Sequence, residues 1–76
     1  MRELLEFMAA YLVDDPSQIK IEALEGQRAV ILQVQVAPDD MGKIIGRGGR
    51  VAKALRELVR AAAVREGKSA IVEIVQ

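Results

Sequence analysis

The sequence contains no cysteine and no histidine, and its aromatic residues are limited to one phenylalanine and one tyrosine. Without cysteine there is neither a disulfide framework nor a thiolate metal site, and without histidine the commonest metal ligand and general base are missing. These absences argue against most hydrolytic and redox chemistry. We therefore expect no enzyme activity, no catalytic residue, no bound metal and no cofactor.

Long apolar runs are also missing. The longest uncharged stretch, residues 29–38, includes Gln33 and Gln35 and falls well short of the ~20 apolar residues that a membrane helix requires. The N-terminal segment carries Glu3 and Glu6 instead of the basic-then-apolar pattern of a secretory signal. At 76 residues the chain is expected to form a single domain, 1–76, that is cytoplasmic and makes no membrane contact.

The net charge of zero conceals a strong asymmetry along the chain. Residues 1–42 contain three basic and eight acidic residues, a net charge of −5, whereas residues 43–68 contain eight basic and two acidic residues, a net charge of +6. A basic block in a neutral chain favours a local anion-binding surface, because the summed field there attracts phosphate. A solvated helix face would give the same bias, so charge alone leaves both interpretations open.

The first half of the chain predicts a helix and two strands. Between Glu3 and Val13 apolar residues recur at three- and four-residue spacing, and Asp15-Pro16 ends the helix. The alternation of Ile19–Ala23 and the β-branched run Ala29–Val36 predict two strands, which the turn at Glu25-Gly26-Gln27 joins as a hairpin.

The second half predicts two helices and a last strand. Pro38 suits the first position of a short helix that reaches about Ile45, and three glycines at positions 46, 48 and 49 disfavour its continuation. A longer helix is expected from Arg50 to about Glu66, with Gly67 as its C-terminal cap, followed by a strand over Ser69–Val75. The predicted order is α-β-β-α-turn-α-β.

The long helix is predicted to be amphipathic, because successive side chains advance by about 100°. One side, expected to pack on the sheet, holds Val51, Leu55, Leu58 and Ala62, and the opposite side holds Arg50, Lys53, Arg56, Glu57 and Arg60. Because the helix starts directly after the glycines, its free N–H groups and the positive end of its dipole lie near Arg47 and Arg50. A phosphate there would meet backbone donors, a dipole and cationic side chains together.

The glycines at 46–49 explain how a nucleic acid could approach the peptide closely. Lacking a β-carbon, they permit unusual backbone angles and let a sugar-phosphate chain lie against the backbone. A tight connection between two helices would use the same glycines, so this structural interpretation stands beside the functional one.

The segment Ile44-Ile45-Gly46-Arg47-Gly48-Gly49-Arg50 resembles the GXXG signature of KH domains, a loop that clamps about four nucleotides. The element order resembles the type II version of that fold. The resemblance implies an α+β domain, α-β-β-α-α-β, with a three-stranded mixed sheet and helices packed on one face. Residues 40–56 are similar, more closely still, to the KhpA family of small bacterial single-KH proteins, also described as YlqC-like.

The resemblance implies that single-stranded RNA binds in a groove between the turn with its helices and a strand with the loop before the last strand. It also implies a role as a general RNA chaperone or post-transcriptional regulator. The RNA-binding residues carried over are Lys43, Ile45, Gly46, Arg47, Gly48, Gly49, Arg50 and Lys53. Two departures bear on them: Ala52 replaces a common isoleucine and leaves a roomier wall, and Gly48 leaves only Arg47 to supply charge within the turn.

KhpA-like proteins are associated with self-pairing and with a larger KH protein, KhpB, so a homodimer or a heterodimer with a KhpB-like partner is expected. Val59 and Ala63 lie at the margin of the predicted apolar face and could serve such contacts, although ordinary packing is the simpler explanation. Phe7 and Tyr11 are expected in the core of the domain, which would leave no aromatic platform for base stacking.

The sequence leaves two other functions to consider, a protein-interaction module and an enzyme. The chain could be a protein-interaction or assembly module of a ribonucleoprotein complex, in which RNA contact is incidental. For an enzyme, the only carboxylate pair beside the basic block is Asp39-Asp40, which capping and dipole compensation explain more simply. Gly42-Lys43 also lacks the Ser or Thr of a phosphate-binding P-loop.

Overall fold

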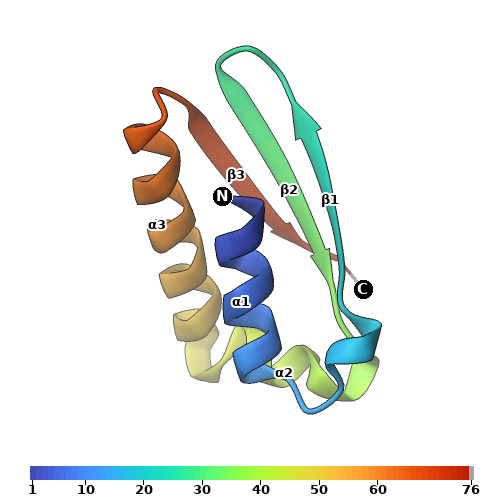
Figure 1. Cartoon of the computed structure of the whole chain (residues 1–76). Coiled ribbons are helices and arrows are strands. Elements are labelled where there is room, and N and C mark those ends of the chain that lie inside the picture. The colour runs from blue at the N-terminus through green and yellow to red at the C-terminus, as the bar shows by residue number, and fades with distance from the viewer. Residues whose placement is uncertain (76) are drawn as a thin grey trace.

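The computed structural model describes residues 1–75 as a three-stranded sheet with helices on one face (Figure 1). The helices are α1 (Arg2–Leu12), α2 (Met41–Ile45) and α3 (Arg50–Arg65), and the strands are β1 (Lys20–Glu25), β2 (Ala29–Gln35) and β3 (Ser69–Ile74). Three-residue 3₁₀ turns lie at Pro16–Gln18, Pro38–Asp40 and Arg47–Gly49. The predicted α+β class and the predicted element order are confirmed.

The sheet is mixed, with strand order β1-β2-β3. β1 pairs with β2 as an antiparallel hairpin, which the Gly26 N–H closes by donating to the Ala29 carbonyl at 2.8 Å. β3 is parallel to β2, since the chain crosses back through α2 and α3 before it re-enters the sheet. The crossover places α2 and the start of α3 at the end of the sheet away from the β1–β2 turn (Figure 1).

The core lies between the sheet and the two long helices. Its largest fully buried side chains are Leu5, Val30, Leu32, Val34, Ile44 and Val59. β2 supplies every second residue to this core, as its alternating pattern predicts. Because Ile44 is fully buried, α2 is held firmly although it has only five residues.

The predicted orientation of α3 is wrong by part of a turn. The buried stripe is Ala52, Leu55, Val59 and Ala63, whereas Leu58 is 54% exposed. Alanine and valine occur around much of this helix, so two neighbouring stripes that share Leu55 fit the spacing equally well. The packed stripe puts the small alanines at positions 52 and 63 against the rest of the domain. Val59 and Ala63 are therefore ordinary core residues.

The expectation that both aromatic residues belong to the core is also wrong. Phe7 is 70% exposed and Tyr11 is 83% exposed, while Leu5 and Ala9 supply the fully buried positions of α1. Leu5 and Ala9 lie one helical turn apart, so they share the face of α1 that packs into the core. Within residues 1–75, no helix is both long enough and apolar enough to cross a membrane.

Candidate nucleic-acid interface

The junction of α2 and α3 is a glycine bend, residues 46–49, called the GXXG bend below. Gly46, Gly48 and Gly49 have φ angles of 75°, 65° and 78°, in the left-handed region that side chains disfavour. A Cβ atom on Gly46 would meet the Val51 side chain at 2.4 Å, whereas Cβ atoms on Gly48 and Gly49 would meet nothing within 4 Å. Gly46 is thus required for packing, and the other two glycines face open space.

The bend is accessible. Arg47 and Gly48 are exposed, and Gly46 and Gly49 are half-buried. Hydrogen bonds from Gly46 N–H to the Gly42 carbonyl at 2.8 Å and from Gly49 N–H to the Gly46 carbonyl at 3.1 Å hold its shape. Gly49 then serves as the N-cap of α3, with no side chain of its own over the first turn of that helix.

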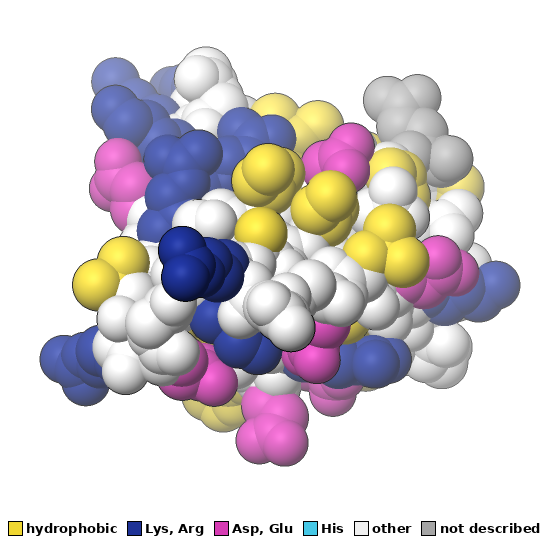
Figure 2. All heavy atoms as spheres, turned by 90° about the horizontal axis from the view of Figure 1, so that it is seen from above, with side chains coloured by type: hydrophobic (Ala, Val, Ile, Leu, Met, Phe, Trp, Pro, Cys, Tyr) yellow, Lys and Arg dark blue, Asp and Glu magenta, His cyan; other side chains and the backbone are white. Residues whose placement is uncertain are grey.

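Cationic side chains surround the start of α3. Arg47, Arg50 and Lys53 are exposed and form no ion pair with another of the described residues 1–75. The start of α3 is also the positive end of its dipole, so the field of the helix reinforces that of these side chains. Lys and Arg side chains also gather on the left of Figure 2, which views the domain from above and therefore shows its other end, near the C-terminus of α3.

An apolar wall adjoins the bend. Ile45, the last residue of α2, is 37% exposed. On the other side of α3, Arg56 Nε donates to the Val72 carbonyl at 3.3 Å, which ties the helix to β3. Ala52, expected to leave a roomier wall, is itself buried at 4% exposure. The structure therefore brings Ile45, Arg47, Arg50 and Lys53 to the same end of the domain.

Lys43 is the predicted site residue whose surroundings differ most from the prediction. Its ammonium group forms an ion pair with Asp14 and a second with Asp40 at 3.8 Å. The hydrogen bond to Asp14 raises the pKa of Lys43 above its ordinary value, and the charges of both aspartates act in the same direction. Lys43 is thus engaged within the protein.

Comparison with known proteins decides the family. Residues 2–74 match a family model described as the KH domain of KhpA/KhpB. A Clostridium acetobutylicum relative, named RNA-binding protein KhpA, is 48% identical over 75 residues, 99% of this chain and 100% of that protein. The chain belongs to the KhpA/KhpB KH-domain family. Its element order is therefore the type II KH topology.

More distant relatives extend the similarity of this KH domain. The Aquifex aeolicus protein of the same name is 33% identical over 76 residues, 100% of this chain and 96% of that protein. Among solved structures, a crystal structure of an Aquifex aeolicus Era variant matches with a TM-score of 0.67 over 95% of this chain and 28% of the Era chain. At 18% identity, the likeness to Era concerns the fold alone.

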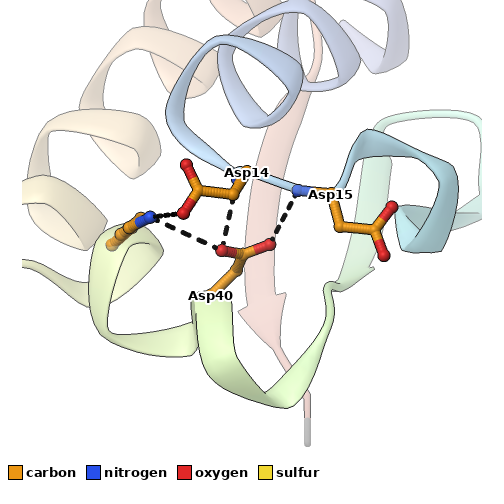
Figure 3. A network of polar contacts seen from close by, with 4 residues as sticks. Asp14, Asp15 and Asp40 are labelled. Atoms are coloured by element: carbon orange, nitrogen blue, oxygen red, sulfur yellow. Dashed lines mark hydrogen bonds and ion pairs between the residues drawn. The ribbon is translucent and has the colours of Figure 1, made fainter.

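A buried carboxylate at the N-terminal end of α2 was not predicted from the sequence. Asp40 is 3% exposed, and its two carboxylate oxygens accept the backbone N–H groups of Asp14 at 3.2 Å and Asp15 at 3.1 Å (Figure 3). The sequence pattern assigns Asp40 to capping and to compensation of a helix dipole. Its real partners lie 25 and 26 positions earlier in the chain, so no local spacing could have found them.

A second missed feature is an exposed apolar surface between α1 and α3, called the α1–α3 surface below. Its most exposed members are Phe7, Tyr11 and Leu58, and Val51 and Ala54 complete its α3 side. Its shallow hollow is lined by apolar residues throughout. The sequence does carry a signal for this surface, because both helices have apolar residues over more of their circumference than one buried face needs. The expectation that these residues belong to the core hides that signal.

Proposed function

We propose that this KH domain binds single-stranded RNA at the GXXG bend. The observation that carries the proposal is an accessible bend whose Gly48 and Gly49 face open space at the cationic, positive-dipole end of α3. A sugar-phosphate backbone can lie against these glycines while Arg47, Arg50 and Lys53 contact phosphates and Ile45 contacts a base. The relatives named RNA-binding protein KhpA support this assignment.

Binding of this kind is weak and tolerant of sequence. The proposed contacts are to backbone phosphates and an aliphatic wall. The exposed Phe7 and Tyr11 lie in the α1–α3 surface and not among these contacts. The aromatic stacking that contributes ~1–3 kcal/mol per base in other single-strand binders is therefore missing from them. Such a domain suits a cytoplasmic RNA chaperone or post-transcriptional regulator that meets many transcripts. The proposed role requires no catalysis.

A charge-reversal pair at the bend tests the proposal. Arg47→Asp with Gly48→Asp adds two anionic side chains where phosphate would lie, and we expect it to abolish binding in a gel-shift titration. If the parent domain neutralises three or four phosphates, log affinity should fall with log salt with a slope of roughly −2 to −3. Cooperative thermal unfolding should be retained, since neither side chain enters the core.

The chain supplies a matched control at the other end of α3. Gly67 has a φ of 72° and, like Gly48, would place a Cβ atom in open space. Arg65→Asp with Gly67→Asp therefore makes the same chemical and charge change in a similar backbone conformation. It should leave most of the binding intact. Equal loss in both double variants would reduce the effect to net charge and contradict binding at the bend.

The α1–α3 surface favours a second function, pairing with another KH domain. Phe7 and Tyr11 are 70% and 83% exposed, and such a cluster of large apolar side chains is typical of interaction sites. The two helices differ in charge, because α1 carries Arg2, Glu3 and Glu6, with Glu6 paired to Arg2, while α3 carries five basic residues and one acidic residue. Under a two-fold rotation, each acidic α1 faces the basic α3 of its partner. We propose self-pairing through this surface, with a KhpB-like protein as the alternative partner.

Leu58→Glu tests the pairing without disturbing the core. Light scattering coupled to size-exclusion chromatography should show a pair for the parent domain and a monomer for this variant. Val64→Glu is the control, because Val64 lies on the same helix, is 72% exposed and lies outside the α1–α3 surface. A monomeric parent that captures purified KhpB-like protein, and loses it with Leu58→Glu, would point to the heterodimer. If Leu58→Glu keeps both self-pairing and capture of the KhpB-like protein, the α1–α3 surface has no role in either.

A further inference from the structure

Lys43 links the predicted RNA site to the acidic half of the chain. It lies on α2, three residues before the GXXG bend, and its ammonium group lies between two aspartates of different character. One is Asp40, within its own segment of the chain. The other is Asp14, which lies just beyond the C-terminal end of α1, 29 residues earlier in the sequence. Figure 3 shows both carboxylates converging beneath α1.

The two carboxylates differ in how firmly they are held. The Asp40 side chain is 4% exposed and accepts two backbone N–H groups, so its position is fixed by the fold. The Asp14 side chain is 81% exposed, and Lys43 is its only ion-pair partner within residues 1–75. The Asp14 carboxylate can therefore rotate into solvent and be hydrated, whereas that of Asp40 cannot.

We infer that Asp14 is an intramolecular competitor of RNA phosphate for Lys43. In the free domain the Asp14 carboxylate occupies the Lys43 ammonium group, and an incoming phosphate displaces it while Asp40 keeps the lysine in place. The exchange replaces one oxygen anion by another on a group with three N–H donors, so it requires no change of fold. Asp14 thereby weakens binding and discriminates against ligands that present too little negative charge. This inference rests on the proposed RNA-binding function.

The size of the effect follows from the exposure of the pair. A solvent-exposed ion pair contributes little free energy. A ligand that must break one loses only roughly 1.4- to 5-fold in affinity. We expect Asp14→Asn to tighten RNA binding within that range. The backbone N–H of residue 14, which donates to Asp40, is retained in this variant, so the anchoring of α2 remains.

The experiment is a double-mutant cycle of the full chain with a fluorescein-labelled oligouridylate, followed by anisotropy over a series of salt concentrations. The variants are Asp14→Asn, Lys43→Gln and the two together. Lys43→Gln should weaken binding and make the salt slope shallower by about 0.7, the value for one phosphate of a single strand. Asp14→Asn should tighten binding in the parent and have no such effect in the Lys43→Gln background.

Asp39→Asn is the matched control for charge. Asp39 is exposed, lies next to Asp40 and forms no ion pair within residues 1–75, so its substitution makes the same change of net charge without releasing Lys43. An Asp14→Asn effect that equals that of Asp39→Asn, or that persists without Lys43, overturns the inference and leaves the proposed function intact. Absence of RNA binding by the parent domain refutes both.

Discussion

Each end of α3 carries a glycine in the left-handed region, but the two ends differ in helix polarity. Gly48 at one end and Gly67 at the other have φ angles of 65° and 72°, and neither has an atom within 4 Å of its Cβ position. At the C-terminal end the chain uses its own groups to satisfy the helix. The Gly67 N–H donates to the Val64 carbonyl at 3.0 Å, and the Lys68 N–H donates to the Ala63 carbonyl at 2.9 Å.

The N-terminal end of α3 has no side-chain cap. Gly49 is the N-cap and carries no side chain to accept from the first turn, and Arg47 and Arg50 add positive charge to the same end. A left-handed glycine is therefore no sign of a binding site by itself. The polarity of the adjoining helix distinguishes the two ends, because the free N–H donors and the positive end of the helix dipole lie at the N-terminal end only.

Removing glycine from the bend should have the largest effect of the changes that compare these ends. In Gly46→Ala the new methyl group would lie 2.4 Å from Val51 Cγ2 and 2.9 Å from the Val51 backbone nitrogen, at a φ of 75°. We expect a loss of roughly 2–4 kcal/mol in the free energy of unfolding, from strain and overpacking together. Urea denaturation measures it.

Gly67→Ala is the control for Gly46→Ala, since it carries the cost of a positive φ without the collision. That cost is about 1 kcal/mol. Equal destabilisation of the two variants would mean that the contact with Val51 relaxes freely, and the structural requirement for Gly46 would then be its φ angle alone.

The anchors of the two ends also differ. Asp40, at the N-terminal end of the α2 helix that leads into the bend, is buried and accepts two backbone N–H groups, whereas Glu66, after α3, is half-exposed and pairs with the N-terminal amine at 3.8 Å. Asp40→Asn would turn an amide NH₂ toward one of those N–H groups, so we expect a loss of about 2 kcal/mol in unfolding free energy. Glu66→Gln should cost at most about 1 kcal/mol. A reversed ranking in thermal or urea unfolding would contradict this assignment.

The arrangement of the fold could be predicted from the sequence because its signals are local. The alternation along β2, the hairpin turn at Gly26 and the glycines after Ile45 each act within a few residues. The rotation of α3 and the exposure of Tyr11 could not, because they depend on which face of a broadly apolar helix finds a partner. An apolar residue beyond the needs of the core looks the same in sequence as one inside it.

The features of the candidate site also divide into those with a local sequence signal and those without one. The bend and the cations of the first turn of α3 follow from spacing, since one helix carries them all. The state of Lys43 does not follow, because its partner Asp14 lies 29 residues away, and only the packing of α1 beside α2 brings them together. Long-range ion pairs of this kind have no periodic signature. Whether each predicted side chain contacts RNA stays a prediction that the variants above address.

Single-cation changes should sharpen the contrast between the helix ends further. Arg50→Gln removes a charge where the dipole of α3 attracts phosphate, so we expect several-fold weaker RNA binding and a salt slope shallower by about 0.7. Arg65→Gln, in the last turn of α3, should leave the slope unchanged. Anisotropy titrations at several salt concentrations measure both, and equal slopes for the two variants would show that the domain binds RNA through diffuse charge rather than at the bend.

The smallest expected effect concerns the pH dependence of the Lys43 ion pairs. Because the hydrogen bond to Asp14 raises the pKa of Lys43 in the folded domain, the pair stabilises the fold below the ordinary lysine value of about 10.4. That contribution is lost as the pH rises through the higher, folded pKa. The difference in unfolding free energy between the parent and Lys43→Met should therefore be constant at neutral pH and shrink above about pH 10.4. An NMR titration of the Lys43 side chain should also show its pKa fall in Asp14→Asn, and an unchanged pKa there would mean that Asp40 alone holds the lysine.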